Sequence, residues 1–104
     1  MATRLDPITP GEILLKEFME PMEISQNKLA RDLDVPVTRI NDLIHAKRGI
    51  TVDTALRLGA YFGTTPEFWV NLQTHYDLKM AQRNLWPAIA KVIRPLQGAT
   101  TASV

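Results

Sequence analysis

Four polar side chains fall together between residues 38 and 42. They are Thr38, Arg39, Asn41 and Asp42. Arginine can donate two hydrogen bonds to guanine, asparagine can pair similarly with adenine, and the threonine methyl group can contact a thymine methyl group. Asp42 is the odd member, because phosphate repels a carboxylate; it would accept from cytosine or simply hold Arg39. With Val37 at the start of the segment, this set is predicted to read base edges of DNA, and the alternative is a solvated helix face.

Residues suited to phosphate contacts flank this set on both sides. Gln26 and Lys28 precede it, at the start of a predicted helix whose exposed amide groups attract an anion. Lys47 and Arg48 follow it, in a predicted loop that would run along the DNA backbone. A simpler interpretation of Lys47 and Arg48 is favourable charge at a helix C-terminus, and both interpretations can hold together.

The element that must position these residues is a pair of short helices at about residues 25–46. Ser25 is a good N-cap for the first helix, the small Ala30 permits a close approach of the second, and the turn falls at Asp34. Apolar residues recur at helical spacing in the two helices, at Leu29, Leu33, Ile40, Leu43 and Ile44, and the turn between them contains Val35. This pattern favours a DNA-binding helix-turn-helix over an ordinary helical hairpin. The second helix, starting near Val37, would enter the major groove.

The rest of the chain is predicted to form further helices and no sustained strand, so the fold class is all-α. The first helix is expected at about residues 11–20, capped by Thr9, with Pro21 ending it. Thr51 would cap another, with Asp53 in its first turn and a left-handed residue at Gly63. The inward positions predicted for that helix are Ala55, Leu56, Gly59 and Phe62. Thr65, Pro66 and Glu67 would open the next helix.

The last quarter of the sequence is less regular. Pro87 interrupts the helical pattern, and a short amphipathic helix is expected before Pro95, with an apolar stripe at Ile89, Val92 and Ile93. Residues 97–104 are predicted to be a polar tail. We therefore expect one domain over residues 1–82, followed by a C-terminal helix and tail over residues 83–104 that form a dimer contact through the apolar stripe.

Composition excludes most catalytic chemistry. The chain has no cysteine, its two histidines, His45 and His75, are far apart, and its five glycines are isolated. We therefore expect no metal site, no cofactor and no enzyme activity. No signal peptide or membrane span is visible, and a cytoplasmic location is expected.

Net charge is only +1, but the charge is unevenly distributed. Residues 1–23 carry two basic and five acidic side chains, whereas residues 24–51 carry five basic and three acidic ones. A chain polarised in this way could present a basic face to phosphate and an acidic face elsewhere.

Several segments of the sequence resemble a known family. The helix pair, with His45 to Arg48 after it, resembles the lambda-repressor-like, Xre-type helix-turn-helix family. The blocks at 47–58 (KRGITVDTALRL) and 62–73 (FGTTPEFWVNLQ), with 76–78 (YDL) and 10–14 (PGEIL), are similar to its HigA subgroup of antitoxins. The resemblance covers about residues 7–80. It departs at Asp34, where the family often has glycine, and at Leu85 to Pro87.

This resemblance implies a compact five-helix lambda-repressor-like domain with an extra C-terminal helix. It further implies a homodimer that binds a palindromic operator in its own promoter and neutralises an RNA-cleaving toxin of the RelE (HigB) type. Two alternatives are a solitary Xre-type regulator without a toxin, and a protein-interaction module that does not touch DNA. The basic and amide side chains near residue 40 argue against the second alternative. The acidic first helix, with Glu12, Glu17 and Glu20, is the candidate toxin-binding surface.

Overall fold

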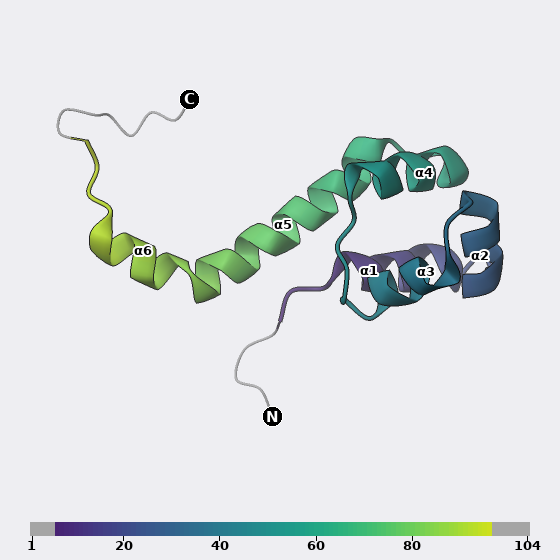
Figure 1. The fold of residues 1–104 in the computed structure, drawn as a ribbon, viewed down its shortest axis with the longest axis horizontal. Coiled ribbons are helices and arrows are strands. Elements are labelled where there is room, and N and C mark those ends of the chain that lie inside the picture. The colour runs from purple at the N-terminus through teal and green to yellow at the C-terminus, as the bar shows by residue number, and fades with distance from the viewer. Residues whose placement is uncertain (1–5, 97–104) are drawn as a thin grey trace.

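The computed structural model describes residues 6–96, and these residues form helices joined by short connections (Figure 1). The predicted tail at residues 97–104 lies outside the described residues. In chain order the elements are α1 (Pro10–Ile13), η1 (Leu14–Met19), α2 (Gln26–Leu33), α3 (Val37–Ile44), α4 (Val52–Phe62), α5 (Pro66–Asn84) and α6 (Trp86–Val92). The all-α prediction is therefore confirmed.

Local capping chemistry explains where most of these helices begin. Thr9 and Glu12 form a reciprocal capping box around Pro10, and the hydroxyl oxygens of Ser25, Thr51 and Thr65 each accept from the amide three residues further on. All four caps are those predicted from the sequence. Proline also occupies the first turn of α5 and of α6, so Pro87 opens a helix rather than only interrupting one.

The first predicted helix differs from a regular α-helix. After one turn it becomes the π-helix η1, in which the amide of Glu20 donates to the carbonyl oxygen of Leu15, five residues earlier. This wider turn brings Leu14 and Met19 to the same side, and both are almost completely buried. Burial of two side chains five residues apart is the physical reason that the α-helical pattern does not hold here.

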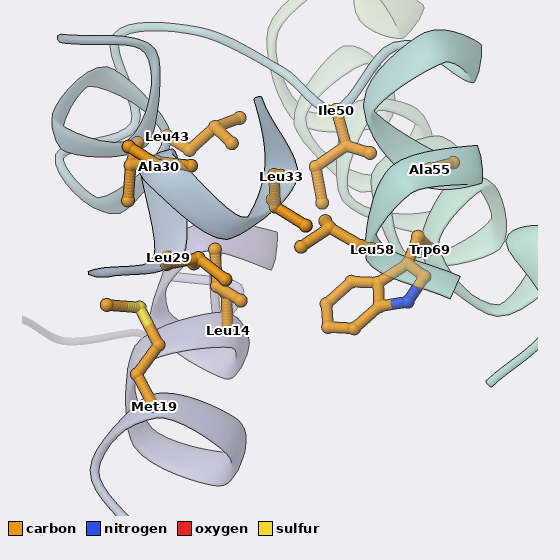
Figure 2. Close-up of a cluster of buried hydrophobic side chains, with 11 residues drawn as sticks. Leu14, Met19, Leu29, Ala30, Leu33, Leu43, Ile50, Ala55, Leu58 and Trp69 are labelled. Carbon is orange, nitrogen blue, oxygen red and sulfur yellow. The ribbon is translucent and has the colours of Figure 1, made fainter. Parts of the chain in front are cut away.

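The hydrophobic core lies between the α1–η1 segment, α2, α3, α4 and the first turns of α5 (Figure 2). Trp69 is fully buried, and its ring nitrogen Nε1 donates to Oγ1 of Thr64 at 2.7 Å. The other buried apolar residues are Leu14, Met19, Leu29, Ala30, Leu33, Ile40, Leu43, Ile50, Ala55 and Leu58.

One predicted inward position is wrong. Leu56 is 54% exposed, because the buried face of α4 is the stripe Thr54, Ala55, Leu58 and Gly59. The residue after Ala55 is turned by about 100° from that stripe and points to solvent.

The helix α1 approaches α3 closely at Gly11. A Cβ atom on this glycine would overlap the carbonyl oxygen of Leu43, so only a residue without a side chain fits there. This contact fixes the start of the chain against the end of α3.

The C-terminal part of the chain leaves the body of the molecule. The first turns of α5 pack in the core, while its second half and α6 extend away from the other helices (Figure 1). Exposed apolar residues mark this arm: Leu78, Leu85, Trp86, Ile89, Val92 and Ile93. Among residues 6–96, no helix has both the length and the apolar character needed to cross a membrane.

Candidate nucleic-acid interface

The helix pair α2 and α3 is joined by a tight turn at Asp34. The backbone of Asp34 is left-handed, with φ 59° and ψ 50°, and its amide donates to the carbonyl oxygen of Arg31. Aspartate tolerates this conformation better than most residues, so it can replace the glycine often found at this turn. The turn places Leu29, Ala30 and Leu33 of α2 in the same core as Ile40 and Leu43 of α3.

Burial of Ile40 and Leu43 leaves the polar face of α3 pointing outward. Val37, Thr38 and Asn41 are exposed, while Arg39 and Asp42 are partly covered. The five predicted base-reading residues therefore lie on the part of α3 that is outside the core, with Asn41 turned toward α2 and Arg39 toward α4. An accessible surface of this kind is needed for contact with a groove.

The structure brings Gln26 and Asn41 together. The side-chain amide nitrogen Nδ2 of Asn41 donates to Oε1 of Gln26 at 3.2 Å. Gln26 is the first residue of α2, so this bond joins a predicted phosphate contact to a predicted base contact. The two residues form one continuous polar surface across the helix pair.

Arg39 is held from a different helix. Its Nη1 atom lies 3.2 Å from Oδ2 of Asp53 in the first turn of α4, and the ion pair that the structure gives Arg39 is with this residue rather than with Asp42. The same oxygen of Asp53 accepts from Nε of Arg57 at 3.0 Å. The hydrogen bond from Arg57 is the main cause that holds the pKa of Asp53 below its ordinary value.

Lys28 makes an ion pair within α2. Its Nζ atom lies 2.9 Å from Oδ2 of Asp32, which also accepts from the hydroxyl group of Tyr61 at 2.6 Å. The Tyr61 hydrogen bond is the main cause that lowers the pKa of Asp32, and the Lys28 hydrogen bond adds to it. Lys28 is exposed, and a phosphate at the start of α2 would compete with Asp32 for its charge.

Lys47 and Arg48 lie exposed in the connection after α3, as predicted. The connection is fixed at both sides. The amide of Lys47 donates to the carbonyl oxygen of Asp42 at 2.8 Å, and the amide of Ile50 donates to Oε1 of Gln73 at 2.7 Å. A loop anchored in this way presents its two cations in a defined place beside α3.

The predicted dimer residues Ile89, Val92 and Ile93 are all exposed, at 42%, 72% and 63%. They lie on or directly after α6, far along the arm from the helix pair (Figure 1). Leu85 and Trp86 line a shallow apolar hollow together with Ile89 of α6 and Leu78 of α5. No group of three or more acidic or histidine side chains within residues 6–96 is arranged to hold a metal ion.

Two residues at the interface were missed by sequence reasoning, Asp53 and Arg57. Their spacing of four residues on α4 is a recognisable helical ion-pair signal. Their contacts with Arg39 and with the carbonyl oxygen of Leu33 depend on how α4 packs against the helix pair, which no local pattern reveals.

The chain is similar to known proteins over most of its length. A family model for helix-turn-helix proteins matches residues 15–69. Virulence-associated protein I of Dichelobacter nodosus is 52% identical over 77 residues, which are 74% of this chain and 71% of that protein. Antitoxin HigA-1 of Vibrio cholerae is 38% identical over 94 residues, 90% of this chain and 88% of that protein.

The likeness extends to solved structures. The antitoxin HigA of Pseudomonas aeruginosa, determined with the higBA promoter, aligns with a TM-score of 0.84 and 46% identity. That alignment covers 86% of this chain and 98% of the other. The similarity therefore includes α5 and its surroundings as well as the helix pair.

Proposed function

The chain belongs to the helix-turn-helix family and, within it, to the HigA-type antitoxins, and from this premise we propose that it is a sequence-specific DNA-binding repressor. It acts on the promoter of its own operon, as the antitoxin of a type II toxin–antitoxin pair. The observation that carries the DNA-binding part is the polar outer face of α3, whose opposite face is fixed in the core by Ile40 and Leu43.

In this proposal α3 lies in the major groove and its outward residues read base edges. Arg39 donates two hydrogen bonds to guanine, Asn41 pairs with adenine, and the methyl groups of Val37 and Thr38 contact thymine. Asp42 faces the same groove and accepts from the amino group of cytosine.

The backbone of the DNA is contacted on either side of α3. Gln26 and Lys28 meet one phosphate at the start of α2, and Lys47 and Arg48 meet the other strand from the anchored connection. Each basic contact releases counterions, so affinity falls as salt concentration rises.

The repressor is a homodimer on a palindromic operator. Residues 1–82 form the DNA-binding domain, and residues 83–104 contribute the dimer contact through Ile89, Val92 and Ile93. A twofold dimer places two recognition helices about 34 Å apart, one turn of DNA. The solvent exposure of all three apolar side chains supports this assignment.

The antitoxin role follows from the family. The partner is a small RNA-cleaving toxin of the RelE (HigB) type, bound in the cytoplasm, and the chain itself performs no catalysis. A neighbouring reading frame that encodes a small basic protein is expected; its absence would favour a solitary regulator instead.

The decisive experiment replaces Arg39 and Asn41 with alanine in one variant. A gel shift with DNA from upstream of the gene should show binding by the natural protein and none by the variant. Binding to the neighbouring toxin, measured by co-purification, should be unchanged.

A control variant, Asn71→Ala with Lys79→Ala, changes an amide and a cation on the exposed face of α5 and should bind DNA normally. Undiminished promoter binding by the first variant would remove these two residues from the site, and no DNA binding by the natural protein would favour a protein-interaction module.

A further inference from the structure

Asp53 sits between two arginines that belong to different parts of the structure. Its Oδ2 atom accepts from Nη1 of Arg39 on α3 and from Nε of Arg57 on α4, at 3.2 and 3.0 Å. Arg57 also donates from Nη1 to the carbonyl oxygen of Leu33, at the end of α2, at 2.9 Å. A chain of charged hydrogen bonds thus runs from the end of α2 through α4 to α3.

This series of hydrogen bonds fixes the side chain of Asp53 more firmly than that of Arg39. Asp53 is on a helix, is held by Arg57, and Arg57 is itself tied to the backbone. Arg39 has a long flexible side chain that is 29% exposed, and Asp53 is its partner among the described contacts. The conformation of Arg39 is therefore set from α4.

The contact leaves enough donors for base recognition. A guanidinium group has five N–H donors, of which Asp53 engages one and a guanine edge engages two. Arg39 can keep its bond to Asp53 while it pairs with guanine. Exposed ion pairs add little to folding stability, so the contact has little to contribute to the fold itself.

The Asp53 carboxylate also affects the binding of DNA that lacks the operator sequence. The Asp53 carboxylate neutralises Arg39 and repels phosphate, which is the group that Arg39 would meet on DNA of any sequence. A guanine edge is uncharged and is not repelled in this way. Asp53 therefore weakens non-specific binding more than specific binding.

We propose that Asp53 is a positioning residue for DNA recognition, which orients Arg39 toward a base and keeps it off the phosphate backbone. The proposal rests on the proposed function above. Its consequence is measurable: Asp53 raises the ratio of specific to non-specific affinity.

The test starts with duplexes selected by the natural protein from a randomised DNA library. Dissociation constants are then measured by fluorescence anisotropy for the selected duplex and for a duplex of scrambled sequence. In the Asp53→Ala variant the affinity ratio should fall about tenfold, the discrimination of one bidentate arginine–guanine pair. The scrambled duplex should be bound more tightly than by the natural protein, and selection by the variant should lose the preference for guanine at one position of each half-site.

Two controls isolate the cause. Glu67→Ala removes the same charge from the equivalent first turn of α5, where the side chain is exposed, and should change the ratio less than twofold. In a background of Arg39→Ala the ratio should already be low, and adding Asp53→Ala should change it less than twofold. Thermal melting of each variant shows that the fold is retained.

Three results would overturn the proposal. They are an unchanged affinity ratio in folded Asp53→Ala, an equal fall in Glu67→Ala, or a full tenfold fall that persists without Arg39. If the natural protein itself selects no sequence, the proposed function fails first, and that outcome is distinct from all three.

Discussion

Asn41 of α3 and Gln26 of α2 are joined by a hydrogen bond of 3.2 Å between their side-chain amides. The bond uses one of the two N–H donors of Asn41 and one acceptor site of Gln26. The second N–H and the carbonyl oxygen of Asn41 stay available for adenine, and both N–H donors of Gln26 stay available for phosphate. The pair can thus remain intact when DNA is bound, and it holds both side chains in place beforehand.

This pairing predicts that Gln26 and Asn41 act as a unit in operator binding. Gln26→Ala and Asn41→Ala should each weaken binding by about 1–3 kcal/mol. The loss of binding free energy in the double variant should be smaller than the sum of the two single losses, by about 0.5 kcal/mol at least. Anisotropy titrations of the four proteins measure this coupling. Additive losses would show that the two side chains work independently on DNA.

The contact of α1 with α3 predicts a steric effect at Gly11. Gly11→Ala places a methyl group against the carbonyl oxygen of Leu43, and it should cost about 1–3 kcal/mol of unfolding free energy, measured by urea denaturation. Gly49→Ala is the comparison and should cost less, because there the added methyl group meets a side chain, that of Gln73 at 3.0 Å, rather than the backbone. Equal stability of the two variants would mean that α1 does not approach α3 as described.

The hydrogen bond from the Tyr61 hydroxyl group to Asp32 should stabilise the folded protein by an amount that depends on pH. The pKa of Asp32 is lowered in the folded protein, mainly by this hydrogen bond. A lowered carboxyl pKa stabilises the fold above the unfolded value of about 3.9, and this contribution disappears as pH falls through the folded value. Tyr61→Phe should therefore lose stability at pH 7 and approach the natural protein in acid, below the folded pKa of Asp32.

Urea denaturation at several pH values and an NMR titration of Asp32 check this prediction. The NMR titration of Tyr61→Phe should show the Asp32 pKa closer to its ordinary value. Tyr76→Phe removes a hydroxyl group from α5 and should not move the Asp32 titration. A stability difference between Tyr61→Phe and the natural protein that is constant from pH 7 to acid would contradict the assignment.

The apolar surface of α6 predicts a charge-sensitive dimer. Ile89→Glu with Ile93→Glu should raise the dimer dissociation constant about tenfold or more, because two carboxylates would be buried in the interface. Sedimentation measures the assembly, and operator affinity should fall with it. Leu56→Glu, at a similarly exposed leucine on α4, should leave the dimer intact. A double variant that stays dimeric would place the interface elsewhere.

Much of the fold could be predicted because its signals are local. The Ser25 cap depends only on the amide of Lys28, and the left-handed Asp34 depends only on the need for a tight turn. Thr65 and Pro66 open α5 by the same kind of short-range chemistry. Such features need no knowledge of what packs against them.

The features that sequence reasoning missed depend on packing between helices. The π-helix η1 exists because both Leu14 and Met19 are buried, and the exposure of Leu56 depends on which side of α4 faces the core. The contact of Asp53 with Arg39 joins residues 14 positions apart on different helices. Hydrophobic spacing identifies helices and their apolar faces, but it does not say which polar groups meet where two helices cross.

The uninterrupted course of α5 has a consequence for where α6 can be. Because α5 runs from the core at Trp69 to Asn84 without a break, α6 is carried at a distance and rotation that depend on a count of residues. One residue inserted in the exposed half would advance α6 by about 1.5 Å and turn it by about 100°. In a dimer closed through α6, that insertion would put the two recognition helices out of phase with the pitch of the duplex. In such a dimer the number of residues in α5 sets the spacing between the two half-sites of the operator. An operator with a different spacing would need an α5 of different length.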